Sequence, residues 1–113
     1  MPSPYVVKAG DVPQIAHPGA NSYPLHSFAG CQTMLNTFCE ADYPAAWGVH
    51  DDHEGFYVIA GKGAFWLEGE EFEIAPGTAM IAPVGMRHGL KKTSVEDLQV
   101  FIFHFSVTKE MLE

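Results

Sequence analysis

The sequence predicts an all-β fold, a closed barrel or double-sheet jelly roll, and three observations lead to this prediction. Eleven Gly and eight Pro divide the 113 residues into short segments, a spacing that suits strands better than long helices. About eight of these segments have the length and composition of strands, and closing them into a barrel would remove exposed edges. No segment keeps a helical hydrophobic period over three turns, which argues against a helical bundle.

The chain is predicted to have an extended N-terminal arm, one barrel and a short tail. Residues 1–30 form the arm, with edge strands, because their frequent prolines exclude a helix. The barrel spans residues 31–108, and residues 109–113 form the tail. The barrel strands are predicted at residues 31–40, 45–50, 56–60, 64–68, 71–75, 79–83, 87–94 and 98–107.

Two of the connections have a recognisable turn chemistry. Gly69 and Glu70 form a polar, glycine-containing step between two strand-like segments, which indicates a hairpin. Residues 51–55 are predicted to hold a tight connection, with Asp51 and Asp52 in the turn, where Asp side chains accept local backbone hydrogen bonds.

Composition and charge exclude several classes of partner. The chain is 47% hydrophobic and 18% charged, enough apolar material for one packed core. Its net charge is -8, and an acidic surface repels both the phosphates of nucleic acids and anionic membranes. No apolar run approaches the roughly 20 residues of a membrane span. We therefore expect neither nucleic-acid nor membrane binding.

The two cysteines and the N-terminus indicate a cytoplasmic protein. On one extended strand, Cys31 and Cys39 would lie roughly 26 Å apart, beyond the reach of a disulfide. We therefore expect buried, reduced thiols. The first ten residues also lack the basic and apolar regions of a signal peptide.

Imidazole and carboxylate groups gather in the segment from Gly48 to Lys92. Gly48 and His50 face the same way on one strand, and Glu54 is expected opposite His50 across the short connection. A second strand–turn unit, containing Gly85, delivers His88. Two His and one Glu converging in a barrel form a facial set of three ligands with open positions, suited to Fe, Mn, Ni, Cu or Zn.

These residues resemble the two motifs of the cupins, G-x5-H-x-H-x3-E-x6-G and G-x5-P-x-G-x2-H-x3-N. Glu54 follows His50 by four residues and precedes Gly61 by seven, as in the first motif. The second motif is matched up to its histidine by Gly77, Pro83, Gly85 and His88. The resemblance is to small, single-domain bacterial cupins of the RmlC-like kind. It implies a double-stranded β-helix (jelly-roll) barrel and a divalent transition metal held by His50, Glu54 and His88.

The chain departs from the cupin pattern at two positions. The first histidine of H-x-H is replaced by Gly48, and the closing asparagine by Lys92, which we expect to be a solvated surface charge. A fourth protein ligand is therefore missing from its usual place. Its substitutes could be water or one of four side chains: His26, His104, Asp52 or His53.

Each candidate ligand also has a structural interpretation. His50 and His88 could be hydrogen-bonded barrel histidines in a cupin that has lost its metal. His53 alternates with Glu54 and should face away from the lumen. His104 shares a strand face with Val100 and Ile102, whereas three phenylalanines share the other, and the sequence does not decide which face lines the lumen.

Two functions are compatible with these observations. The first is a small metal-dependent enzyme acting on an oxygen-rich small molecule, of the dioxygenase, isomerase, lyase or decarboxylase type. The alternative is a non-catalytic binding or sensing module for a sugar-like ligand, because the first motif also resembles the cupin of arabinose-type transcription regulators. Since the chain is short, its N-terminal third is extended and residues 98–105 are apolar on both faces, we also expect a homodimer.

Overall fold

The computed structural model describes residues 3–40 and 48–106. Within them, the all-β prediction is confirmed, because apart from one short 3-10 helix, η1 Ala9–Asp11, all regular elements are strands. None of the helices in this part of the chain is long and apolar enough to cross a membrane. The strands are β1 Ile15–His17, β2 Ala20–Phe28, β3 Cys31–Phe38, β4 Asp52–Ala60, β5 Gly63–Leu67, β6 Glu70–Ile74, β7 Ala79–Ala82, β8 His88–Lys92 and β9 Leu98–Ser106.

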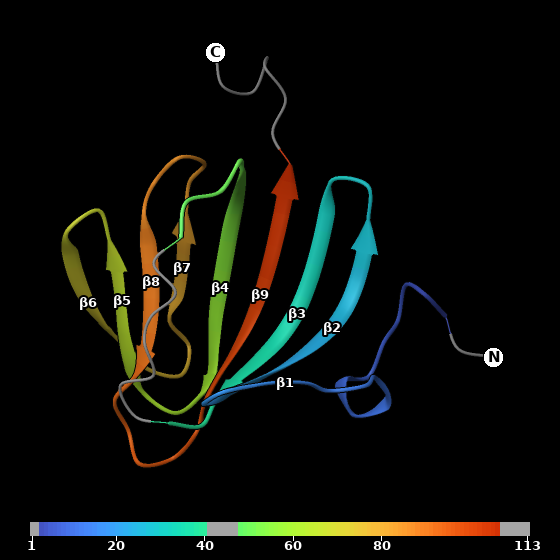
Figure 1. Ribbon diagram of the computed structural model, residues 1–113, viewed down its shortest axis with the longest axis horizontal. Helices are drawn as coiled ribbons and strands as arrows, with labels where there is room; N and C mark the ends of the chain where they lie inside the picture. Colours follow the sequence, from blue (N-terminus) through green and yellow to red (C-terminus); the bar gives the residue numbers. More distant parts are fainter. Residues whose placement is uncertain (1–2, 41–47, 107–113) are drawn as a thin grey trace.

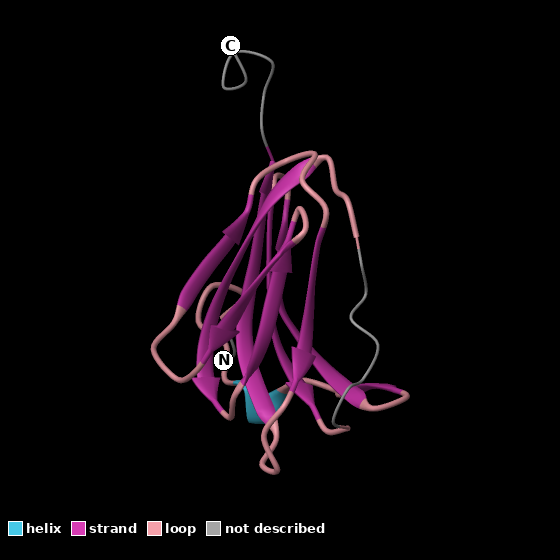
Figure 2. Ribbon diagram, turned by 90° about the vertical axis from the view of Figure 1, so that its left-hand side faces the viewer, coloured by secondary structure: helices cyan, strands magenta, loops and turns pink. Residues whose placement is uncertain are grey.

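The strands form two antiparallel sheets. The larger sheet has six strands in the order β1-β2-β3-β9-β4-β7, and the smaller has three in the order β6-β5-β8. Figure 1 shows the larger sheet curving from β2 round to β4, with the smaller sheet on the left. The view in Figure 2 shows the connecting loops gathered at the two ends of the strands. This arrangement is a double-sheet jelly roll.

The core lies between the two sheets and is built by alternating residues. On β4, Phe56 and Val58 are buried, and on β9, Val100 and Ile102 are buried opposite them. The smaller sheet adds Phe65, among others, to the same cluster. Because successive strand residues point to opposite faces, this register also fixes which side chains of β4 and β9 lie outside.

The N-terminal third contributes more regular structure than edge strands alone. β2 is nine residues long and lies inside the larger sheet, between β1 and β3. It contains Pro24, and the pairing with β3 shifts register between Pro24 and His26, which is where a strand tolerates proline. The proposed boundary between residues 30 and 31 stays a prediction, as does the tail at residues 109–113, which lies outside the described residues.

Two predicted connections differ in detail from the structure. The hairpin joining β5 and β6 is present, but its turn residues are Glu68 (φ 47°) and Gly69 (φ 92°), a pair of positive φ angles typical of a type I′ turn. The tight connection expected at residues 51–55 is absent, because β4 already begins at Asp52. Of the strand predicted at residues 45–50, residues 45–47 lie outside the described part of the chain.

The absence of a side chain at Gly55 allows a phenylalanine to pack on β4. Gly55 pairs with Phe103 of β9, and a Cβ added at Gly55 would lie 2.1 Å from Cζ of that ring. The ring therefore rests directly on the backbone of β4, on the outer face of the larger sheet. Phe103 in turn stacks on Phe105, with ring centroids 5.9 Å apart.

We predict that Gly55→Ala destabilises the fold, because the new methyl group must displace the Phe103 ring. Inserting a methyl group into packed structure costs about 1–3 kcal/mol, which urea unfolding would measure. Gly10→Ala is the matched control, since a Cβ there meets no atom within 4 Å. Equal stability of G55A and the wild type would show that the ring is not held against β4.

Candidate metal centre

The three predicted ligands come from three separate parts of the fold. Glu54 lies on β4 of the larger sheet, and His88 begins β8 of the smaller sheet. His50 lies just before β4, in a segment that runs alongside β8 of the smaller sheet. The Gly48 and His88 backbones exchange two hydrogen bonds, and the Gly85 amide donates to the His50 carbonyl. The chain therefore crosses from one sheet to the other between His50 and Asp52.

His50 and Glu54 are therefore not joined by the expected hairpin, but the structure brings the same three side chains together. One ligand atom from each of His50, Glu54 and His88 lies within 4.8 Å of the other two. Nε2 of His88 is 2.8 Å and Nε2 of His50 is 3.4 Å from Oε1 of Glu54. The Glu54 and His88 side chains are 10% and 7% exposed, whereas the His50 side chain is 43% exposed.

The backbone orients the ring of His88. Its Nδ1 lies 3.1 Å from the carbonyl oxygen of Met86, which can only accept, so Nδ1 carries a proton and donates it. This contact directs Nε2 toward Glu54 and makes Nε2 the atom available to an ion. A histidine whose second nitrogen donates to a carbonyl is the usual arrangement in metal sites.

Without an ion, His88 favours its charged form. Its pKa is raised above the ordinary value of 6.5, first by the hydrogen bond to Glu54 and then by the Met86 carbonyl and the charges of Glu54 and Asp52, while burial opposes the shift. The pair is therefore held by a charge-assisted hydrogen bond, which compensates the burial of the Glu54 carboxylate.

His104 lies on the lumen side, which settles the question left open by the sequence. It pairs with Glu54 across β9 and β4, and cross-strand partners share a face. Its Nε2 is 3.2 Å from Oε2 of Glu54, and its Nδ1 is 3.3 Å from the carboxylate of Asp52. His104 is not among the residues whose ligand atoms all lie within 4.8 Å of one another.

The other histidines considered as substitutes lie on the opposite face of the larger sheet. His26 pairs with Thr33, which pairs with Phe103, in the outer row that also contains Gly55. Both of its ring nitrogens have other partners, Oγ1 of Thr33 at 2.6 Å and the Tyr5 carbonyl at 3.0 Å. The structure therefore does not bring His26 to the site.

His53 also points away from the lumen, as expected from its alternation with Glu54. Its Nδ1 accepts a hydrogen bond of 2.9 Å from the Val84 amide, and its ring packs on Phe105.

Two expectations about exposure are wrong. Lys92 is 4% exposed rather than solvated, because it follows His88 and Leu90 on the inward face of β8. Cys31 and Cys39 are free thiols, as expected, but both are exposed rather than buried, at the two ends of β3.

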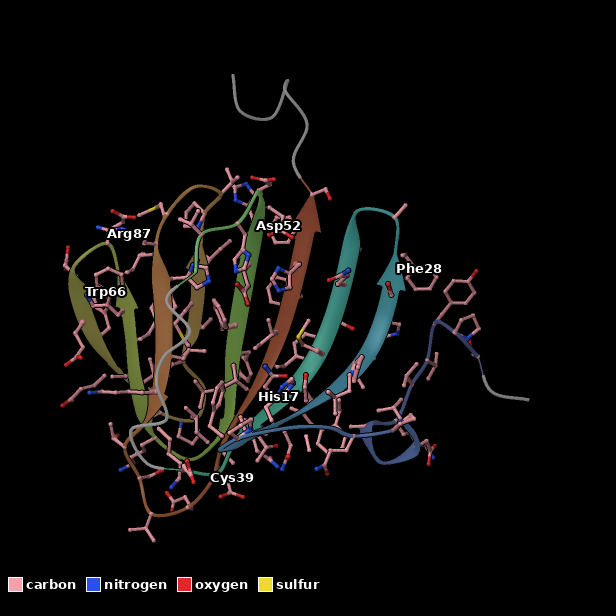
Figure 3. The ribbon with its side chains drawn as sticks, viewed as in Figure 1. His17, Phe28, Cys39, Asp52, Trp66 and Arg87 are labelled. Atoms are coloured by element: carbon pink, nitrogen blue, oxygen red, sulfur yellow. The ribbon has the colours of Figure 1, made fainter. Side chains whose placement is uncertain are left out.

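His50, Glu54 and His88 border a cavity of about 230 Å³ between the sheets. Its walls are largely apolar, and Phe38, Phe56, Leu90 and Ile102 are among them. Two polar residues that the sequence analysis did not select, His17 and Asn36, also line it. Figure 3 shows His17 toward the lower end of the molecule, whereas Asp52 lies near the top of β4.

No local sequence signal identifies His17 or Asn36 as cavity residues. Asn36 faces inward because it pairs with Val100, which pairs with Val58. It accepts a 2.7 Å hydrogen bond from the Ser22 hydroxyl, which leaves its amide NH₂ as a donor.

Comparisons with known proteins establish the family. The model of the cupin domain matches residues 41–104, more than half of this 113-residue chain, and the chain therefore belongs to the cupin family. Among curated proteins, no sequence matches the chain.

Solved structures share the fold at low sequence identity. A predicted oxalate decarboxylase from Thermotoga maritima is 17% identical, with 90% of this chain and 99% of that chain covered and a TM-score of 0.79. An RmlC-like cupin from Shewanella frigidimarina is 11% identical, with 92% of each chain covered and a TM-score of 0.78. KdgF from a Halomonas species is 21% identical, with 90% and 93% covered and a TM-score of 0.73. These likenesses confirm the cupin jelly roll.

The donor set of this chain fits the divalent metal that cupins commonly bind. Two imidazole nitrogens and one carboxylate oxygen, gathered within 4.8 Å, match the facial set that Fe(II) and related ions accept. Glu54 and His88 are held by strands of different sheets, so the cluster depends on the packed barrel.

We predict that the stability of the metal-free protein falls with rising pH through the charge on His88. Because its folded pKa is raised, His88 stabilises the fold fully below its ordinary value of 6.5, and this contribution is lost as the pH rises through the folded pKa. Urea unfolding of the chelator-treated protein from about pH 6 to about pH 9 would measure the loss. In Glu54→Gln, which removes the main cause of the shift, the loss should be smaller. An equal pH dependence in both proteins would contradict this.

Proposed function

We propose that this cupin holds one divalent transition-metal ion through His50, Glu54 and His88 and acts there on a small molecule that offers an oxygen atom to the ion. The observation that carries the proposal is the convergence of the two histidines and one carboxylate at the border of a largely apolar cavity. A bound ion would supply Lewis-acid or oxygen-activating chemistry, as in dioxygenases, isomerases, lyases or decarboxylases. Three protein ligands leave positions open for substrate, as catalytic sites require.

The cavity supports a substrate of restricted size and mixed polarity. A volume of about 230 Å³ suits a small metabolite rather than a polymer. Its aromatic and aliphatic walls would contact the carbon skeleton, while His17 and Asn36 offer hydrogen bonds at a distance from the ion along the lining. This distribution of polar and apolar groups favours a small molecule with an oxygen atom at the end that would reach the ion.

The ligand types define the class of ion rather than one particular metal. Imidazole and carboxylate ligands suit Fe, Mn, Ni, Cu and Zn, and hard-ion sites for Mg or Ca would use more oxygen donors. The alternative function, a non-catalytic binding module, uses the same cavity without the ion. Metal content therefore separates the two.

We predict that protein purified without a His tag contains one of these metals at about one ion per chain, as measured by elemental analysis. Glu54→Gln should weaken Ni²⁺ or Zn²⁺ binding by at least about 10-fold in isothermal titration. Loss of an outer group that only orients a ligand already costs about 10-fold in affinity, and loss of a ligand itself should cost more. A metal-free wild type that does not take up Ni²⁺ or Zn²⁺ would overturn the metal proposal and leave the binding module.

Two further variants complete this experiment, one as a control and one that should gain affinity. His26→Asn, on the opposite sheet face, should bind metal like the wild type. Gly48→His should bind more tightly, because the residue paired with His88 shares its face, and an added imidazole on a preformed site contributes another bond.

We also propose that the protein is a homodimer, formed through the outer face of the larger sheet. Two rows of paired residues cross this face: Ile81, Gly55, Phe103, Thr33 and His26; and Ala79, Tyr57, Phe101, Leu35 and Tyr23. Tyr57 and Ile81 are 47% and 48% exposed, which leaves an apolar surface open to solvent. Such surfaces mark interaction sites.

The charge distribution favours a second copy as the occupant. Neither row contains Asp, Glu, Lys or Arg, although the chain carries a net charge of -8. Two copies of an acidic chain repel each other wherever their carboxylates meet, and an uncharged face avoids that repulsion. Symmetric pairing places the same patch on both sides, which suits a self-complementary aromatic surface.

We predict that the wild type elutes as a dimer in size-exclusion chromatography with light scattering, and that Tyr57→Glu shifts it to monomer. The substitution places two carboxylates in the proposed interface without touching the core. Val95→Glu is the matched control, because Val95 is 98% exposed in the connection between β8 and β9. A monomeric wild type, or equal dissociation in both variants, would contradict this interface.

We further propose a cytoplasmic location. Its support is that Cys31 and Cys39 are both free and exposed, and exposed thiols persist in a reducing compartment. The expectations of no nucleic-acid and no membrane partner stay predictions from the net charge.

A further inference from the structure

The two oxygens of Glu54 have different partners. Oε1 lies 2.8 Å from Nε2 of His88 and 3.4 Å from Nε2 of His50, the two imidazoles of the proposed metal centre. Oε2 lies 3.2 Å from Nε2 of His104. The carboxylate is thus divided, with one oxygen toward the metal centre and the other toward a third imidazole.

His104 is itself held from behind. Its Nδ1 is 3.3 Å from each oxygen of the Asp52 carboxylate, so both ring nitrogens face carboxylates. Asp52 and Glu54 share a face of β4 because they are two residues apart, and β9 delivers His104 to that face opposite Glu54. The side chains of His104 and Asp52 are 15% and 30% exposed, and both border a separate cavity of about 110 Å³.

We propose that Asp52 and His104 form a positioning pair that fixes the Glu54 carboxylate, turning Oε1 toward the ion while Oε2 is retained by His104. This inference rests on the proposed metal centre and assigns a role to two residues outside its three ligands. It makes Glu54 a ligand through one oxygen. His104 takes part as an outer group, because its ligand atoms do not join the set that lies within 4.8 Å.

Outer groups of this kind influence metal affinity by orienting the ligands they contact. Here the pair acts on a ligand that would otherwise rotate about its last side-chain torsion, which is broad and soft in glutamate. Glu54 already contacts two imidazoles through Oε1, so a carboxylate free to rotate would spend less time with that oxygen toward the ion. Asp52 contacts His104 rather than Glu54. Removing the Asp52 carboxylate therefore tests whether Asp52 positions Glu54 by holding the His104 ring.

The first experiment measures Ni²⁺ affinity by isothermal titration. His104→Phe keeps an aromatic ring and removes both nitrogens, and Asp52→Ala removes the outer carboxylate. Both should weaken binding by about 10-fold or more. Asp52→Asn, which keeps an acceptor oxygen, should recover part of the loss, whereas His26→Asn should have no effect. Wild-type affinity in both H104F and D52A, or equal losses in D52A and D52N, would overturn the positioning pair, because equal losses reflect charge alone.

The second experiment counts the nitrogens bound to Cu²⁺ by electron paramagnetic resonance. The positioning pair predicts two imidazole nitrogens, from His50 and His88, in the wild type and in H104F. A third nitrogen in the wild type that disappears in H104F would overturn the pair and make His104 a ligand.

A third measurement needs no metal. In chelator-treated protein, the ring N–H signal of His88 reports its 2.8 Å contact with Glu54, and nuclear magnetic resonance should detect its shift or broadening in H104F but not in H26N. An unchanged His88 signal in H104F would overturn the positioning pair. A wild type that binds no metal would instead overturn the proposed function, so the two failures are distinguishable.

Discussion

The site depends on one buried carboxylate. Glu54 lies between the two sheets, where an isolated charge would be strongly destabilising. Three imidazoles surround it, from His50, His88 and His104, at distances of 2.8 to 3.4 Å. Each comes from a different segment, so the cost of burying the carboxylate is offset only when β4, β8 and β9 are all in place. The same electrostatic requirement therefore brings together the three side chains that we propose as metal ligands.

The register between β4 and β9 determines both faces of the larger sheet. Pairing Glu54 with His104 turns Val100 and Ile102 into the core and leaves Phe101 and Phe103 outside. A shift of one residue would turn one of the two strands over, placing either the phenylalanines of β9 in the lumen or the Glu54 carboxylate outside. Gly55 makes this register specific, because only a residue without a side chain accommodates the Phe103 ring. The proposed metal centre and the proposed dimer surface are thus two consequences of one pairing.

The fold and the convergence of His50, Glu54 and His88 could be predicted from the sequence because their signals are local. Turn residues mark the strands, and the fixed spacing from Gly77 to His88 defines one strand–turn unit. The side of the sheet occupied by His104 could not be predicted, because it depends on pairing with a residue 50 positions away. The burial of Lys92 could not be predicted for a related reason. A lysine side chain is usually exposed to solvent, whereas the position of Lys92 on β8, four residues after His88, places it inside the barrel. The exposure of Cys31 and Cys39 depends on where β3 ends, which local composition does not specify.

One departure from the family pattern, the glycine at position 48, has a physical consequence for the proposed metal centre. Gly48 pairs with His88 but carries no side chain, so no imidazole at this position can approach an ion beside His88. The additional imidazole of this chain, His104, lies instead on the far oxygen of Glu54 and is retained there by Asp52. On our proposal, an imidazole at position 48 would be a ligand, whereas the imidazole of His104 holds the ligand Glu54 in place. In the proposed metal centre, the lack of a side chain at Gly48 would leave one side of the ion open, and an open side is where a substrate oxygen can bind.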